Sequence, residues 1–233
     1  MKSIENHVES VLEDFEKIGI LQDVLFIGAW ARYFYKEHFK SETDYYPRLA
    51  TKDLDILLPK EKAKQSLQID LHQKLLEFGY QHQIFRNSLI KYYKNELELE
   101  FLLPTHGSKR IVSVKALNIK AQQLPYLEML WESPIHIRYG KYQVSIPDPY
   151  DFVVHKLIIS SSRSVRQTKL QDIRDAEEVL VVLMQEKGFE SKLSRVCIKY
   201  TKNKKAKSKV LKVLPFLLDP GLRKLLNKAI EEK

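Results

Sequence analysis

Apolar residues recur at helical spacing near the start of the chain and then gather into short runs. The spacing over residues 4–18 predicts an amphipathic helix. A short β-rich run from Asp23 to Ile27 ends at Gly28, and the apolar, aromatic segment 29–39 is long enough for a helix. The apolar positions of 54–58 predict a second strand. The first sixty residues therefore alternate between helix and strand.

The middle of the chain is rich in strand signals. A helical stripe over 62–78 is followed by Gly79 at the position of a C-cap. Five runs after it predict strands: 83–86, 89–94, 97–103, 135–139 and 142–146. Gly140-Lys141 separates the last two runs and predicts a hairpin. In 97–103 leucine and phenylalanine alternate with glutamate, which is typical of a strand with one buried face.

Helical signals take over after residue 146. Asp148-Pro149 has the sequence of an N-cap and a first helical residue. Thr168 with Gln171 resembles a capping box for the next helix, and Asp219-Pro220 predicts the start of a last one. The pattern as a whole predicts an α/β part over 1–146 and a helical part over 147–233.

The composition narrows the class of protein. Apolar residues make up 44% of the 233 positions, which is enough for a sizeable core. The single cysteine, Cys197, excludes an internal disulfide and a four-cysteine zinc site. No apolar run approaches the length of about 18 residues that a transmembrane helix needs, and the first ten residues show no signal-peptide core. We therefore expect a soluble cytoplasmic protein with no membrane partner.

The net charge of +9 is confined to the end of the chain. Residues 1–187 contain 26 basic and 26 acidic side chains, whereas residues 188–233 contain 13 and 4. The segment 199–212 holds seven lysines and no acid. This distribution excludes a uniformly basic surface and leaves two interpretations: a solvated helix face, or an element that binds an acidic acceptor such as RNA. The lysines assigned to the second interpretation are Lys202, Lys204, Lys205 and Lys207.

Asp53 and Asp55 carry the main chemical signal. Residues i and i+2 of a strand share a face, so the two carboxylates project together with Cα atoms about 6–7 Å apart. Such a pair repels unless a cation lies between its members, and Mg²⁺ is the cation that binds through one or two carboxylates. The same pattern also occurs at solvated strand edges, so it needs support from elsewhere in the chain.

Other residues supply that support. Gly28 ends a strand and opens a helix, whose free N–H groups suit a phosphate. Glu100 is the better candidate for a third carboxylate. Glu98 lies on the same face of the predicted strand and remains an alternative. Lys156 interrupts an otherwise apolar helix face, and Lys169 and Asp172 are neighbours at i, i+3 on the next predicted helix.

The order of these motifs resembles the nucleotidyltransferase superfamily, which has the DNA polymerase β-like fold. The matching residues are Phe26-Ile27-Gly28-Ala29-Trp30-Ala31, Thr51-Lys52-Asp53-Leu54-Asp55-Ile56 and Glu100. The helical half resembles a narrower branch that includes the AbiEii-like toxins and uncharacterised bacterial and archaeal relatives. Its matching residues are Arg48, His155-Lys156-Leu157, Arg163 and Lys169-Leu170-Gln171-Asp172. The resemblance implies an α+β fold: a nucleotidyltransferase-type mixed sheet with flanking helices, then a C-terminal helical domain.

The resemblance also implies an activity, the transfer of a nucleoside monophosphate from a nucleoside triphosphate to an acceptor hydroxyl. Asp53, Asp55 and Glu100 would hold two Mg²⁺ ions, with Mn²⁺ as a substitute. The residues implied in nucleotide binding are Gly28, Ala29, Thr51, Lys156, Lys169 and Asp172, with Asp172 orienting Lys169 or meeting the sugar. Arg48 and Thr51 would steady the loop before the acids.

The acceptor stays open at this stage. RNA such as a tRNA end, a protein hydroxyl and a small molecule all fit, and the toxin-like branch adds an antitoxin protein as a partner. The alternative function is a module with this fold that has lost turnover and binds RNA or a partner protein. Metal-dependent nucleotide binding would favour the enzyme, whereas salt-sensitive RNA binding without transfer would favour the module.

Overall fold

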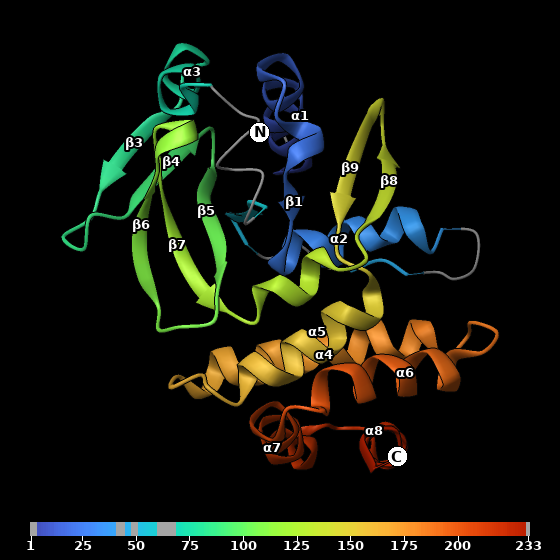
Figure 1. The fold of residues 1–233 in the computed structure, drawn as a ribbon. Coiled ribbons are helices and arrows are strands. Elements are labelled where there is room, and N and C mark those ends of the chain that lie inside the picture. Colours follow the sequence, from blue (N-terminus) through green and yellow to red (C-terminus); the bar gives the residue numbers. More distant parts are fainter. Residues whose placement is uncertain (1–3, 41–44, 48–50, 60–68, 232–233) are drawn as a thin grey trace. The chain divides into compact units, whose positions relative to one another are not determined.

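The structure is a computed structural model that describes residues 4–40, 45–47, 51–59 and 69–231. The chain divides into two compact units. The first consists of Met1–Glu37 and Tyr46–Pro147, and the second of His38–Tyr45 and Asp148–Lys233. Figure 1 shows that the strands belong to the first unit and that the C-terminal part is helical.

The first unit combines a mixed sheet with helices. Its helices are α1 (Ile4–Ile18), α2 (Gly28–His38, which ends in the second unit) and α3 (Leu71–Glu77). Its strands are β1 (Leu25–Phe26), β2 (Asp53–Leu57), β3 (Gln81–Ile84), β4 (Ile90–Lys94), β5 (Leu97–Thr105), β6 (Arg110–Val114), β7 (Ile119–Pro125), β8 (Ile135–Tyr139) and β9 (Tyr142–Ile146). The last two form the predicted hairpin.

Strand β5 is the centre of the sheet (Figure 1). The described strands follow the order β1-β2-β5-β4-β3, and β7 adds to β5 and carries β6 on its other side. The pairs β2·β5 and β5·β7 are parallel, and the remaining pairs are antiparallel. The sheet therefore joins β2 and β5 directly, although 39 residues, 58–96, lie between them along the chain.

Alternation along β2 and β5 separates an apolar face from an acidic one. Leu54 and Ile56 of β2 are fully buried, as are Leu99 and Phe101 of β5. The residue between the members of each pair is acidic, Asp55 in β2 and Glu100 in β5. Helix α1 contributes its apolar stripe to this core, where the ring of Phe15 lies 6.2 Å from that of Phe26. Burial of this face leaves the carboxylates of β2 and β5 together on the opposite face.

The second unit is built around a buried helix. Its helices are α4 (Pro149–Ser160), α5 (Arg166–Leu183), α6 (Phe189–Thr201), α7 (Lys204–Val213) and α8 (Pro220–Glu231). Every residue of α4 except Ile159 is buried. The Asp148 carboxylate accepts hydrogen bonds from the backbone N–H groups of Tyr150 and Asp151, at 2.8 and 3.3 Å. The predicted N-cap of α4 is therefore confirmed.

The structure confirms the predicted α+β class and corrects several local predictions. The capping box at Thr168 is wrong, because α5 already begins at Arg166 after Val165, whose side chain makes no capping bond. Strands β6 and β7 had no counterpart in the sequence patterns. Of the predicted helix 62–78, residues 62–68 lie outside the described part, and α3 covers 71–77. No helix in the described part of the chain is long and apolar enough to cross a membrane.

Candidate functional site

Four carboxylates gather on one face of the first unit. The parallel pairing of β2 with β5 sets Asp53 opposite Glu98 and Asp55 opposite Glu100. Directly opposed residues of paired strands project to the same side, so both acidic pairs share a face. Asp53 is exposed, whereas Asp55, Glu98 and Glu100 are partly buried. The predicted site acids Asp53, Asp55 and Glu100 are thus brought together, with Glu98 beside them.

A lysine lies against this face, and the sequence reasoning missed it. Lys91 of β4 makes ion pairs with Glu98 and with Glu100, the latter at 3.2 Å from Nζ to Oε2. Burial opposes the charged form of Lys91, but the hydrogen bond to Glu98 and the charge of Glu100 raise its pKa above the ordinary value. One cation is therefore shared by two of the four carboxylates.

Gly28 is pressed against Asp55. The backbone N–H of Ile27 donates to the carbonyl oxygen of Asp55 at 3.0 Å, which fixes the turn between β1 and α2 beside β2. Gly28 has φ +65°, in the left-handed region, and a Cβ built on it would lie 2.6 Å from Oδ2 of Asp55. The positive φ favours glycine here, and any Cβ would also displace the end of the Asp55 side chain. The start of α2, predicted to face the phosphates, therefore adjoins the second aspartate.

Ala29, which follows Gly28, and Thr51, which precedes the two aspartates, have simpler roles. Ala29 is the second residue of α2, where backbone N–H groups have no partner within the helix. The hydroxyl of Thr51 accepts a hydrogen bond from the backbone N–H of Asp53 at 3.0 Å and so holds the entry to β2. Arg48 lies outside the described residues.

The acidic face has donors of the kind that bind a metal ion, but they are not closely grouped. Among the described residues, no three His, Cys, Asp or Glu side chains are grouped closely enough to hold one. The chemistry of the donors nevertheless suits Mg²⁺, because all four groups are hard oxygen ligands, and the missing Cβ of Gly28 leaves room for the Asp55 carboxylate. Asp53, Asp55 and Glu100 are therefore the residues that would hold such an ion, and Glu100 also contacts Lys91.

In the second unit, Lys156 is the centre of a buried ion network. Its ammonium donates to Oδ1 of Asp172 at 2.7 Å and to Oδ2 of Asp175 at 2.9 Å. Arg163 donates to the other oxygen of Asp172 at 2.8 Å. Burial opposes the charge on Lys156, but the two aspartates raise its pKa overall. The network holds two cations and two anions and is therefore balanced.

Lys169, the other predicted phosphate ligand, lies apart from this network. Its ammonium is 4.0 Å from the centroid of the Phe216 ring, which is a cation–π contact. Within the described residues, the carboxylate of Asp172 is engaged by Lys156 and Arg163 rather than by Lys169. Lys169 is partly exposed, whereas the Lys156 side chain is 9% exposed.

His155 precedes the network and is buried as a neutral ring. Its Nε2 has no hydrogen-bond partner in the described structure. Burial, with the adjacent charge of Lys156, lowers the pKa of His155 to about 3. A histidine of ordinary pKa 6.5 would thus be protonated in the unfolded chain at a pH where the folded chain still excludes the proton.

This difference predicts a pH dependence of stability. The contribution of His155 is complete above about pH 6.5 and is lost as the pH falls toward 3, by about 1.4 kcal/mol per pH unit. Between pH 7.5 and 5.0 we expect a loss of about 2 kcal/mol. Urea unfolding followed by circular dichroism at both pH values measures it. His155→Gln cannot take up the proton, so it should lose about 2 kcal/mol less; equal losses in the two proteins would contradict the prediction.

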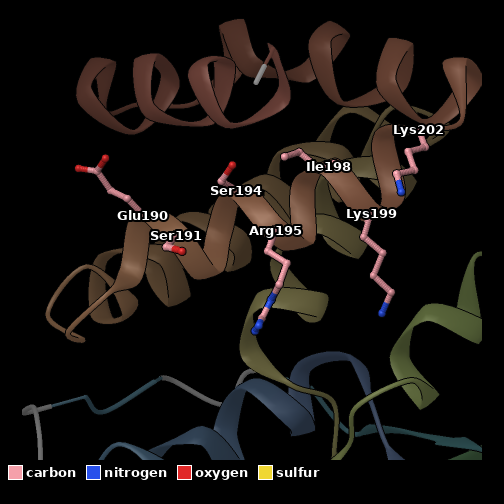
Figure 2. Close-up of a pocket in the computed structure, with 7 residues that line it drawn as sticks. All are labelled: Glu190, Ser191, Ser194, Arg195, Ile198, Lys199 and Lys202. Atoms are coloured by element: carbon pink, nitrogen blue, oxygen red, sulfur yellow. The ribbon is translucent and has the colours of Figure 1, made fainter. Parts of the chain in front are cut away.

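Three of the four predicted acceptor lysines, Lys202, Lys204 and Lys207, line two open pockets of the second unit. The first has a volume of about 750 Å³, and Figure 2 shows Arg195 and Lys199 leaving α6 in the same direction along it. Its lining residues are Glu190, Ser191, Ser194, Arg195, Ile198, Lys199 and Lys202. The second, of about 410 Å³, is lined by Lys204, Lys207, Ser208, Leu211 and Lys212. Lys205 is exposed, and Lys207 donates to the carbonyl of Ile230 at 3.1 Å.

Of the comparisons with known proteins, the family model agrees with the order of the motifs. A family model described as nucleotidyltransferase matches residues 6–196. No curated protein matches the chain. Two solved structures are similar. One is an antigenic nucleotidyltransferase-like protein from Paracoccidioides brasiliensis, with 13% identity, a TM-score of 0.44 and coverage of 87% of this chain and 91% of that one. The other is the antibiotic-resistance factor ANT(2'')-Ia, with 10% identity, a TM-score of 0.43 and coverage of 85% and 97%.

The family match confirms the predicted resemblance to the nucleotidyltransferase superfamily. It spans both the acidic strands of the first unit and the helices α4 and α5 of the second. The narrower likeness to AbiEii-like toxins stays a prediction. The chain belongs to the nucleotidyltransferase family.

Proposed function

We propose that the protein transfers a nucleoside monophosphate from a nucleoside triphosphate to an acceptor hydroxyl in a reaction that depends on Mg²⁺ or Mn²⁺. The observation that supports this proposal most directly is the register of β2 and β5, which opposes Asp53 and Asp55 to two glutamates beside Gly28. Because residue 28 is glycine, backbone and not a side chain borders the carboxylate of Asp55 at the start of α2.

The predicted site residues of this face have proposed roles. Asp53 and Asp55 would hold the metal, with Glu100 as the third acid, and the metal would supply charge neutralisation for the phosphates. The backbone of Gly28 and Ala29 approaches the triphosphate at the start of α2. In the reaction, the acceptor oxygen forms a bond to the α-phosphorus while the bond to the bridging oxygen breaks, and pyrophosphate leaves. Glu100 accepts the hydroxyl proton.

The second unit is proposed to supply further contacts. Lys169, which is partly exposed, fits the neutralisation of the β- and γ-phosphates. Lys156 shares this predicted role but is already paired with Asp172 and Asp175, and Asp172 would reach the nucleotide only from within the same network. For the acceptor we propose RNA, held through Lys202, Lys204, Lys205 and Lys207, because this segment carries the excess charge of the chain.

The assay is a transfer reaction with the unmodified full chain. Each α-³²P-labelled nucleoside triphosphate is incubated with Mg²⁺ or Mn²⁺ and with total RNA, tRNA, protein or small-molecule fractions. We expect label to move to the RNA fraction, to require the divalent ion, and to fall steeply between about 50 and 200 mM salt, as contacts to several phosphates dictate.

Other outcomes discriminate the alternatives. Label on protein or on a small molecule, insensitive to salt, would retain the enzyme and reject the RNA acceptor. Salt-sensitive RNA binding with no transfer of any nucleotide would reject the enzyme and favour the binding module. An antitoxin-like partner would be supported by a co-purifying protein that abolishes transfer when it is added back.

A further inference from the structure

We infer that Lys91 competes with the divalent cation for Glu100 while retaining Glu98, so that this lysine sets both the metal affinity of the acidic face and the identity of its third acid. The inference rests on the proposed function, because it assumes that Asp53 and Asp55 bind a metal. It goes beyond that function by assigning a positioning role to a residue outside the motifs.

The two ion pairs of Lys91 are unequal. The ammonium donates a hydrogen bond to Oε1 of Glu98, whereas its distance to Oε2 of Glu100 is 3.2 Å. Charge-assisted hydrogen bonds between nitrogen and oxygen are ordinarily about 2.7–2.9 Å long. The contact with Glu100 is therefore the looser one and the first to be exchanged. Glu98, tied to Lys91, is held in its present place.

Position in the sheet makes the exchange specific. Glu100 lies opposite Asp55, the aspartate against which Gly28 is pressed, whereas Glu98 lies opposite the exposed Asp53. A cation held by Asp55 thus meets Glu100 as its neighbour across the strands. It also meets the ammonium of Lys91, and the two positive charges repel. The lysine must leave Glu100 for the metal to gain it, and its bond to Glu98 gives it a place to stay.

Partial burial makes this competition strong. The side chains of Lys91, Glu98 and Glu100 are 22%, 25% and 16% exposed, so solvent screens their charges less than it screens surface pairs. Lys94 provides a matched comparison on the same strand. It is 19% exposed and pairs with Asp14 of α1, and an offset of three residues directs it to the other face of the sheet.

The test measures Mn²⁺ binding to the full chain without nucleotide, by the electron paramagnetic resonance signal of free Mn²⁺ and by calorimetry. A cation within about 4–6 Å changes the proton affinity of a carboxylate by about one to three powers of ten. We therefore expect Lys91→Gln to lower the Kd for Mn²⁺ by about tenfold or more. Lys94→Gln, which removes the same charge, should leave the Kd unchanged, and Lys91→Arg should keep it near the wild-type value.

A second pair of variants identifies the acid. In a Glu100→Gln background the tightening caused by Lys91→Gln should be lost, whereas in a Glu98→Gln background it should persist. Loss in the Glu98→Gln background instead would overturn the choice of Glu100. An unchanged Kd in Lys91→Gln, or equal tightening in Lys94→Gln, would overturn the competition. Circular dichroism of each variant without metal verifies that it is folded.

The same measurement separates this inference from the proposed function. If Mn²⁺ binds with the expected differences but no nucleotide is transferred, the inference stands and the proposed function fails. If transfer occurs and wild type and Lys91→Gln bind Mn²⁺ equally, the function stands and the inference fails. If neither protein binds Mn²⁺ at millimolar concentration, the inference and the proposed function are both contradicted, because each assumes that a metal binds.

Discussion

Asp55→Asn is expected to lower nucleotide transfer by about a hundred- to a thousandfold, the loss that follows removal of one preorganised electrostatic group from an active site. The change in the free energy of unfolding should stay below about 1 kcal/mol. Asparagine has nearly the same shape as aspartate, so it preserves the packing against Gly28. It removes the charge on which the metal and the triphosphate depend.

The expected stability is a consequence of the surroundings of Asp55. Its carboxylate lies on a face with three other acids, so neutralising it relieves repulsion. The carboxylate also lies beside Gly28 at the start of α2, where a negative charge contributes about 0.3–1 kcal/mol, and asparagine loses that contribution. These effects oppose each other. A large loss of activity in a stable protein would therefore report on chemistry and not on folding.

Glu96→Gln is the matched control. Glu96 precedes Glu98 by two residues, is exposed, and pairs with Lys52 at 2.9 Å, a surface contact that contributes little. Its variant should keep the transfer rate within about twofold of wild type. Initial rates at saturating nucleotide, with thermal unfolding of each protein, provide the comparison. Equal rates for Asp55→Asn and wild type would contradict the assignment of this face as the active site.

Local patterns predicted that acids alternate with apolar residues in β2 and β5. They did not predict how the two strands bring these acids together. Asp-x-Asp and the run Leu97–Leu103 each show which residues share a face. The register that opposes Asp55 to Glu100 depends on pairing between strands distant in sequence, and no local pattern specifies it. Lys91 falls within a predicted strand, but its contact with the acids arises only when β4 adds to β5.

The helical unit shows a similar division. Asp148-Pro149 predicts the start of α4 because the cap is a local interaction. The capping box predicted at Thr168 is wrong because the backbone N–H of Lys169 bonds to the carbonyl of Val165. The first turn of α5 therefore already includes Thr168. The lysine in an apolar helix was noticed, but its partner Asp175 was not. Two aspartates at i, i+3 on the next helix, Asp172 and Asp175, were the available signal for a buried ion network.

Lys156→Met should destabilise the second unit by about 3–5 kcal/mol, the cost of leaving buried charges without their partner. The side chains of Asp172 and Asp175 are 5% and 4% exposed, so water cannot replace the ammonium. Arg163 still pairs with Asp172, and the uncompensated charge therefore falls mainly on Asp175. Methionine fills a similar volume, which keeps the packing of α4 against α5 nearly unchanged.

Urea unfolding followed by circular dichroism measures this loss, because the second unit consists of helices. Trp30 and Trp131 both lie in the first unit, so their fluorescence monitors that unit in the same titration. Adding Asp175→Asn to Lys156→Met should recover part of the stability, since it removes the unpaired charge together with its cation. Lys169→Met, which breaks only the contact with Phe216, should cost about 1 kcal/mol or less.

The same variants decide between two roles for Lys156. If the lysine serves the fold, Lys156→Met lowers the unfolding midpoint, and the double variant with Asp175→Asn regains stability and retains nucleotide affinity. If the lysine serves the phosphates, Lys156→Met unfolds at the wild-type urea concentration, yet its Kd for the nucleoside triphosphate rises by tenfold or more, about 1.4 kcal/mol per factor of ten. The buried pairs at 2.7 and 2.9 Å favour the first outcome, because an ammonium that compensates two buried carboxylates leaves them only at the cost of that stability.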